Sequence, residues 1–496
     1  MSSFVIIYLI LLIAYFIKIS IRGESLYIKL VGLYLSICIM FIPLYFIIRI
    51  DNTLYNYMHI IWLFGFNLGL DGISLTFILL TTILTPLSII ANWNNIKYFN
   101  YYILILLLIE ILLIILFMIL DVLGFYIFFE AILPLLFLFI GIGGNKYKFI
   151  ASIYIFMFTL IGSLFLLVAL LSLIKILGSS DFFSFFKNNI NYLGQSYLFI
   201  GLFISFAVKT PLIPLHGWLL KAHVESPLSG SMILAGIILK LSAFGIIRLI
   251  IPITPKSLWN YSIYLGVLGI ITIIIISLST IKASDIKELI AYSSISHAAV
   301  YILGIISNNI QGIEGGILLG LGHGFVSPAL FIITGGVLYD RYHSRDINSI
   351  RGVIQLMPIL SILFFIFTLS NCGVPLSLNF VGEFLSLYGF FEKLPILGIF
   401  ANFSIILSAG YSIYLYNKVV FGNYLVINNY LFSISDISKQ ETYVLILLAL
   451  LTIIFGIYPN ICLDIISNNI SSLIWYNFDT PLLPSNSTIY KSLNIN

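Results

Sequence analysis

Charged residues and cysteines are scarce in this sequence of 496 residues. Aspartate, glutamate, lysine and arginine together make up 8% of it, whereas a soluble domain has about 25%. The three cysteines lie far apart, and the sequence has no CxxC spacing, no Gly-rich dinucleotide fingerprint and no phosphate loop. We therefore expect neither a soluble enzyme nor a chain that binds a redox cofactor by itself, and the net charge of +4 argues against nucleic-acid binding.

Hydrophobic residues make up 61% of the sequence, in runs that are long enough to cross a bilayer. One crossing needs about 20 apolar residues. The N-terminus has neither an Arg-rich transit peptide nor a small-residue cleavage site, so we expect it to form the first span. We expect about 14 spans, at 4–21, 28–49, 71–92, 100–120, 123–142, 148–176, 196–222, 227–250, 258–280, 285–306, 311–338, 354–393, 395–421 and 441–470. The sequence thus predicts an all-α polytopic membrane protein, with a small hairpin between the second and third spans.

Basic residues predict the sidedness of these spans. With the N-terminus outside, 14 of the 23 lysines and arginines fall on the inner side and 7 on the outer side. Positive charge is enriched on the inner side of membrane proteins. We therefore expect both termini outside, because fourteen crossings return the chain to the face on which it started.

Two of the expected spans are interrupted by proline. Pro211 breaks the seventh span and Pro375 breaks the twelfth, and each removes a backbone donor and frees a carbonyl. The two spans are five apart, so they run in opposite directions, which is typical of inverted repeats with a site near mid-membrane. The predicted organisation is three N-terminal helices in 1–99, two inverted five-helix halves in 100–250 and 258–421, and a loop, a helix and a tail in 422–496.

Glu130 in the fifth span and Lys209 in the seventh are the first pair of charges expected inside the membrane. A charge at mid-membrane costs at least about 2.5–3.5 kcal/mol and usually marks a function. Both spans start on the outer side, so the two residues lie at comparable depths. A pair would stabilise both charges, and separating it would favour release of a proton from Lys209, which makes a switch. The alternative is that Glu130 only neutralises a neighbouring lysine.

Lys240 and Glu383 are two more candidates inside the membrane. Lys240 lies midway along the eighth span, too far from either end to reach water easily, although snorkelling is the alternative. Glu383 lies in the second half of the broken twelfth span, where the alternative is a capping acid near the interface. The sequence leaves the roles of Glu110 and Glu314 open.

Four histidines complete the candidate residues. His297 and His323 lie in the tenth and eleventh spans, between Lys240 and Glu383 in chain order. Histidine titrates near neutrality and suits a proton relay, although a lone histidine in an apolar helix is often a core residue. His216 and His223 follow the first break near the inner face, where they would feed protons inward. No i,i+4 histidine pair and no HExxH motif occurs, so we expect no metal site.

Taken together, five long motifs in this order resemble the antiporter-like membrane subunits of respiratory complex I, a family shared with multisubunit sodium/proton antiporters. The resemblance covers nearly the whole chain and is weakest before residue 60 and after residue 460. Glutamate rather than lysine at Glu383 matches one branch of that family. The motifs are FYIFFEAILP, FAVKTPLIPLHGWLLKAHVESPLSGSMILAGIILKL, DIKELIAYSSISH, GHGFVSPALFIITGGVLYDR and SNCGVPLSLNFVGEF.

This resemblance implies a role for each candidate. Glu130 and Lys209 would be a modulating ion pair, Lys240, His297 and His323 a central hydrophilic axis, and Glu383 the terminal site toward the intermembrane space. NADH, FMN, iron–sulfur clusters and ubiquinone would belong to the whole complex and not to this chain. The implied partners are lipid and the other membrane-arm subunits, both antiporter-like and accessory.

The implied location is the mitochondrial inner membrane, with both termini on the intermembrane-space side. Scarce alanine beside abundant isoleucine, asparagine, tyrosine (31) and phenylalanine (41) resembles AT-rich mitochondrial coding. Two rival functions remain. One is a cation/proton antiporter subunit without a redox partner. The other is a structural membrane anchor whose charges only hold helices together.

Overall fold

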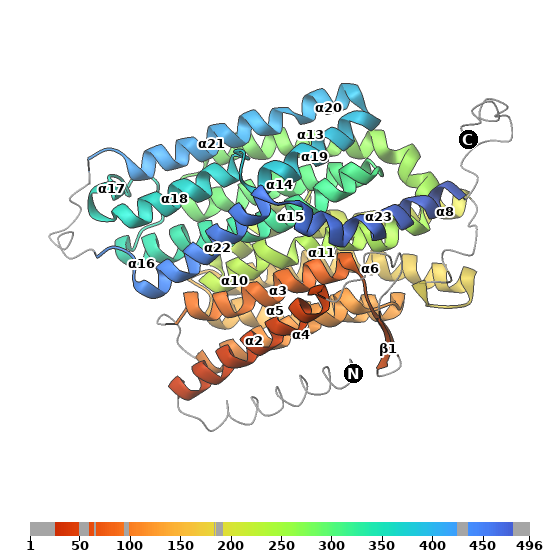
Figure 1. The fold of residues 1–496 in the computed structure, drawn as a ribbon, viewed down its shortest axis with the longest axis horizontal. Coiled ribbons are helices and arrows are strands. Elements are labelled where there is room, and N and C mark those ends of the chain that lie inside the picture. Colours follow the sequence, from red (N-terminus) through yellow and green to blue (C-terminus); the bar gives the residue numbers. More distant parts are fainter. Residues whose placement is uncertain are drawn as a thin grey trace.

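The computed structural model describes residues 25–48, 59–63, 66–93, 99–182, 184, 192–423 and 435–479. It is a bundle of long helices with one two-stranded hairpin (Figure 1). Eleven of the described helices are long and apolar enough to cross a membrane, and two shorter apolar helices are Leu193–Lys209 and Pro358–Asn371. The prediction of a polytopic, mostly helical membrane protein is confirmed. The first expected span, 4–21, lies outside the described residues.

The N-terminal part of the bundle is formed by four long helices and the hairpin. Strands β1 and β2 pair antiparallel, as expected between the second and third spans. Asp71 caps helix α3 by accepting a hydrogen bond from Ser74 N at 2.9 Å, which satisfies one of the free donors at a helix start. The elements are α2 (Ser25–Ile48), β1 (His59–Leu63), β2 (Phe66–Leu70), α3 (Gly72–Ala91), α4 (Phe99–Met118) and α5 (Val122–Gly143).

The next part of the chain contains the first break and two π-helical segments. The expected seventh span is interrupted after Lys209 and resumes at Gly217, so Pro211 lies in the interruption. The expected eighth span contains two π segments, which the sequence analysis did not anticipate; such segments often mark functional sites. The elements are α6 (Lys148–Leu177), α8 (Tyr192–Lys209), α9 (Gly217–Glu225), α10 (Leu228–Ile233), η1 (Leu234–Ile238), α11 (Lys240–Gly245), η2 (Ile246–Ile250) and α12 (Ile251–Ile253).

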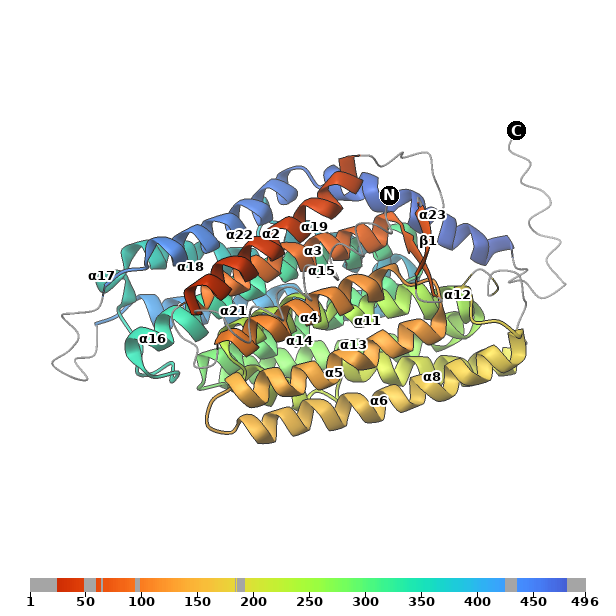
Figure 2. The same cartoon turned by 90° about the horizontal axis from the view of Figure 1, so that it is seen from below.

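The third part supplies the centre of the molecule. Helices α14 and α15 are almost entirely buried, and α15 packs against α10, α14, α18, α19, α22 and α23. Figure 2 shows α14 and α15 enclosed by helices from both ends of the chain, with α6 and α8 on the outside. The elements are α13 (Pro255–Lys282), α14 (Ile286–Ile306), α15 (Ile310–Phe331), η3 (Ile332–Leu338), α16 (Tyr339–Tyr342), α17 (Val353–Leu356) and α18 (Pro358–Asn371).

The last part contains the second break and one correction. The expected twelfth span stops at Asn371 and resumes at Leu378, around Pro375. The expected single helix over 441–470 is wrong: it divides before Pro459, because the residue that precedes a proline disfavours the helical conformation. The elements are α19 (Leu378–Lys393), α20 (Pro395–Ala401), α21 (Phe403–Val420), α22 (Lys439–Ile457) and α23 (Asn460–Asp479).

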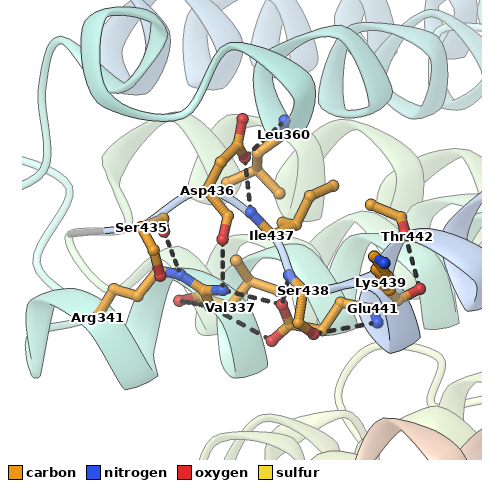
Figure 3. A network of polar contacts seen from close by, with 10 residues as sticks. All are labelled: Val337, Arg341, Leu360, Ser435, Asp436, Ile437, Ser438, Lys439, Glu441 and Thr442. Carbon is orange, nitrogen blue, oxygen red and sulfur yellow. Dashed lines mark hydrogen bonds and ion pairs between the residues drawn. The ribbon is translucent and has the colours of Figure 1, made fainter.

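Three of these helices meet in a polar junction at one end of the bundle (Figure 3). Arg341 of α16 donates two hydrogen bonds to the carboxylate of Glu441, of 2.8 and 3.3 Å, and others to the carbonyls of Ser435 and Asp436. The Asp436 carboxylate accepts from the amides of Ile359 and Leu360 at the start of α18. This junction therefore fixes the first half of the broken twelfth span to the ends of α16 and α22.

Candidate functional site

Lys240 is the first member of a buried polar chain through the centre of the molecule. Its side chain is fully buried at the first residue of α11, which Leu239 separates from η1. Its Nζ donates to the carbonyl of Ala235 and lies 2.8 Å from Nδ1 of His323. Long helical side chains point toward the N-terminus of their helix, so Lys240 reaches back along its own helix to that carbonyl. An ammonium group has donors only, so His323 accepts through Nδ1 when Lys240 is charged.

His323 and His297 continue the chain from α15 to α14. Both histidines are buried, and their ring centroids are 5.5 Å apart. Nε2 of His323 has no hydrogen-bond partner among the described residues. Nδ1 of His297 lies 2.9 Å from Oε1 of Glu383. Lys240, His323, His297 and Glu383 thus come from four different helices and follow one another in contact or near contact.

Glu383 lies in the first turns of the second segment of the broken span, against the break itself. Gly373 has a φ of +69°, and a Cβ built there would lie 2.6 Å from Oε2 of Glu383. Only glycine adopts this backbone conformation easily and leaves that space. The interruption after Asn371 therefore provides the room in which the carboxylate meets His297.

A small cavity borders this end of the chain. Its walls include His297, Glu383 and Tyr411, together with Ser277, Ser296, Ser404 and Ser408, and it has about 10 Å³ of space for the centre of a water molecule. That is about what one water needs, and a buried water usually makes two to four polar contacts. The polar lining suits a water that touches both the carboxylate and the hydroxyls.

Glu130 and Lys209 are neighbours but not a contact ion pair. The charge of each acts on the other, yet Nζ of Lys209 has no hydrogen-bond partner among the residues described. Nζ instead lies 4.1 Å from the centroid of the Phe129 ring, a distance typical of a cation–π contact. Glu130 is half-buried and borders Ser163. The structure therefore places the two charges close together, with Lys209 held by an aromatic face.

His223 and His216 differ in how near they lie to the chain. His223 is fully buried on α9 and stacks on Phe331, with ring centroids 4.9 Å apart. Neither of its ring nitrogens has a hydrogen-bond partner in the described part of the protein, and the charges of Lys287 and Lys240 act on it. His216 is half-buried in the break before α9. His223 is thus the buried histidine of the two, packed against Phe331 of α15, the helix that also carries His323.

The sequence analysis missed several buried polar residues. Lys287 and Arg248 lie near the ends of expected spans and were not candidates, but both are buried: Lys287 donates to the carbonyl of Ser226 at 2.7 Å, and Arg248 forms an ion pair with Asp71. Asp71, at the start of an expected span, was not a candidate either. Tyr411, whose hydroxyl lies 3.3 Å from Nε2 of His297, was not singled out. The two basic residues were not recognised as buried because they lie near span ends. Nothing in the sequence distinguishes Tyr411 from the other tyrosines, of which the chain has 31 in all.

The two glutamates that the sequence left open differ in their burial. Glu110 is fully buried and accepts a hydrogen bond of 2.7 Å from Thr85. Glu314 is half-buried near the start of α15. Among the residues that the structure describes, no three histidine, cysteine, aspartate or glutamate side chains group as metal ligands would.

Comparison with known proteins places these features in one family. Residues 119–408 match the family described as "NADH:quinone oxidoreductase/Mrp antiporter, TM". The chain is 47% identical over 411 residues to NADH-ubiquinone oxidoreductase chain 4 of Mycosarcoma maydis, covering 82% of this chain and 84% of that one. It is also similar to a chain of Thermus thermophilus respiratory complex I, with a TM-score of 0.86, 26% identity and coverage of 95% of this chain and 99% of that one.

A chain of the Mrp complex from Dietzia sp. shares the fold. The TM-score is 0.84 at 15% identity, covering 97% of this chain and 99% of that one. At this identity the likeness concerns the fold alone. The matched family residues include the whole central chain from Lys240 to Glu383.

Proposed function

The chain belongs to the NADH:quinone oxidoreductase/Mrp antiporter family, and we propose that it is subunit 4 of mitochondrial respiratory complex I, an antiporter-like subunit that translocates protons. The observation that carries this proposal is the buried chain Lys240, His323, His297 and Glu383. A charge in the membrane is costly, and titratable groups that face one another there mark proton pathways. Histidine is the side chain best suited to take up and release a proton near neutral pH.

One experiment tests this role at the middle of the chain. Asparagine in place of His323 is too short to bridge Lys240 and His297, so His323→Asn is expected to abolish proton pumping in the assembled complex. His343→Asn is the matched control, because His343 is exposed at the end of α16. Equal pumping by the two variants contradicts the proposal.

We propose that Glu130 and Lys209 regulate the chain. Coulomb energy falls with distance and with the local dielectric constant, so a small movement of Lys209 over Phe129 changes its interaction with Glu130. The energy for this movement comes from quinone reduction elsewhere in the complex. Lys209→Ala and Glu130→Ala are each expected to lower the proton-to-electron ratio of the assembled complex. A wild-type ratio in both variants contradicts the regulatory role.

Proton uptake is proposed through His216 and His223, and release beyond Glu383 toward the intermembrane space. The charges of Lys287 and Lys240 act on His223, and Glu383 is at the other end of the chain. The proposed location is the mitochondrial inner membrane with both termini on the intermembrane-space side. The halves 100–250 and 258–421 are proposed as inverted repeats, which the breaks at Pro211 and Pro375 support.

Electron transfer belongs to other subunits in this proposal. The complex uses NADH, FMN, iron–sulfur clusters and ubiquinone, and this chain contributes the proton path and its control. Its partners are the neighbouring membrane-arm subunits and lipid. The activity of the assembly is therefore that of a proton-translocating NADH:ubiquinone reductase.

The rival function is that of an antiporter subunit without a redox partner, because the Mrp chain has the same fold. The 47% identity to a chain of NADH-ubiquinone oxidoreductase favours complex I. Purification of the tagged chain from native membranes decides between them. Co-purifying NADH:quinone reductase activity supports the proposal, and its absence from an intact complex supports the antiporter.

A further inference from the structure

Tyr411 connects His297 to a neighbouring serine on the side opposite Glu383. The tyrosine is buried on α21. Its hydroxyl lies 3.3 Å from Nε2 of His297 and 3.2 Å from Oγ of Ser296. Both nitrogens of the His297 ring therefore have a partner: Glu383 at Nδ1 and Tyr411 at Nε2.

Counting protons shows which group donates in each contact. Ser296 has one hydroxyl proton and donates it to the carbonyl of Ser293 at 2.8 Å. Ser296 therefore accepts from Tyr411. Tyr411 also has a single proton, so it donates either to Ser296 or to His297, and never to both at once.

The protonation state of His297 determines this choice. When Nε2 is bare, it accepts the hydrogen bond from Tyr411. When Nε2 carries a proton, it donates to the tyrosine oxygen, and the hydroxyl proton of Tyr411 must turn to Ser296. In each state the buried groups keep their hydrogen bonds, and a buried donor without a partner is costly.

We propose that Tyr411 and Ser296 form a hydroxyl rotor that lets Nε2 of His297 gain and lose a proton while Nε2 and the Tyr411 hydroxyl stay hydrogen-bonded. No bond of Tyr411 breaks: its O–H turns between two acceptors. Tyr411 is thus a positioning residue that acts through His297. The proposal rests on the proton-translocating role proposed above for the central chain.

The test compares two tyrosines with the same chemistry in the assembled complex. Tyr411→Phe removes the rotor, whereas Tyr301→Phe, also buried, removes a hydroxyl that donates to the Leu239 carbonyl at 3.1 Å. We expect Tyr411→Phe to lower the rate of NADH-driven pumping about tenfold, the scale on which loss of one buried partner acts, and Tyr301→Phe to pump as the wild type. Equal rates in the two variants overturn the proposal.

Ser296→Ala provides a second, smaller change with its own control. Ser294→Ala removes a hydroxyl on the same helix that donates only to the Ile290 carbonyl at 3.1 Å. Because Tyr411 and Ser296 act as one unit, the double variant Tyr411→Phe, Ser296→Ala is expected to pump no more slowly than the slower single variant. Multiplied losses in the double variant overturn the proposal, as does wild-type pumping in Ser296→Ala.

A pH profile of pumping separates this role from packing. Tyr411→Phe is expected to shift the profile, since both protonation states of His297 lose their partner at Nε2 but an unpaired buried N–H on a charged ring costs more than an unpaired bare nitrogen. The titratable groups that face His297 are Glu383 and His323, with Cys372 beside Glu383, and all three remain in the variant. An unchanged profile with a lowered rate overturns the rotor.

Glu383→Gln in the same membranes separates the two proposals. Normal pumping in Glu383→Gln contradicts the proton-translocating function itself. Lost pumping in Glu383→Gln beside normal pumping in Tyr411→Phe contradicts the rotor alone.

Discussion

His297 and Glu383 meet at 2.9 Å between Nδ1 and Oε1, although 86 residues separate them in the sequence. One residue comes from a central helix and the other from the second half of a broken span. This contact joins the two central histidines to the carboxylate at the end of the chain. The position of the Glu383 carboxylate in this contact depends on the backbone of the break.

Gly373→Ala is expected to separate Glu383 from His297. The new methyl group would lie 2.6 Å from Oε2 of Glu383, at a φ of +69° that disfavours any side chain. Pumping should fall several-fold while the complex still assembles. Gly410→Ala, in α21, is the matched control, because a Cβ there meets nothing within 4 Å. Proton-pumping assays on both variants check this, and equal rates would show that the break does not position the carboxylate.

Lys240→Arg and Lys240→Met together distinguish a relay from a structural anchor. Arginine keeps the positive charge but does not release its proton in proteins, whereas methionine removes the charge at similar length. A relay loses pumping at least tenfold in both variants. If Lys240 were only a structural anchor, the Lys240→Arg variant would pump faster than the Lys240→Met variant. Pumping that is retained in Lys240→Arg therefore contradicts the relay. Lys175→Arg, at the exposed end of α6, controls for the substitution.

Asp71→Asn is expected to destabilise the protein more than it affects the chemistry. It leaves the positive charge of buried Arg248 without its ion-pair partner, and breaking a buried pair costs about 3–5 kcal/mol. The amount of assembled complex on a native gel should fall sharply. Asp121→Asn is the control, because Asp121 also caps a helix, by accepting from Gly124 N at 2.9 Å, and is only half-buried. Equal amounts of assembled complex in the two variants would contradict a stabilising role for the Asp71–Arg248 ion pair.

Arg341→Lys tests the junction of α16, α18 and α22. Lysine cannot reproduce the paired hydrogen bonds of the guanidinium group to Glu441, so we expect a loss of about 1–3 kcal/mol, the scale of charge-assisted hydrogen bonds. A lower melting temperature of the purified complex is the measurement. Arg351→Lys is the control, since Nε of Arg351 has no hydrogen-bond partner among the described residues. Identical melting temperatures for both variants would contradict a stabilising junction.

The sequence predicted the central chain because the membrane makes polar residues conspicuous. Lys240 and Glu383 interrupt runs of apolar residues, and a charge inside a long apolar run needs a physical reason. Proline marked both breaks for a similar reason, since it cannot continue the hydrogen bonding of a helix. Both features are local in the sequence, so they can be recognised without knowing how the helices pack.

What the sequence could not predict depends on packing. Depth along two helices does not fix which way their side chains face, and so Glu130 and Lys209 lie near each other without the expected direct contact. Arg248 lies near a span end, where hydropathy cannot distinguish a loop residue from one that turns inward. Tyr411 has no sequence signal, because its contact with His297 depends on how α21 packs against α14.

Proton pumping by membranes that carry Glu383→Gln tests the central claim most directly, with NADH oxidation and a native gel measured in parallel. Glutamine keeps the size of the side chain but cannot carry a proton between His297 and the far side. The account predicts an assembled complex that has lost both pumping and coupled oxidation. Normal oxidation with normal pumping would contradict it, and Glu383 would then be a structural acid.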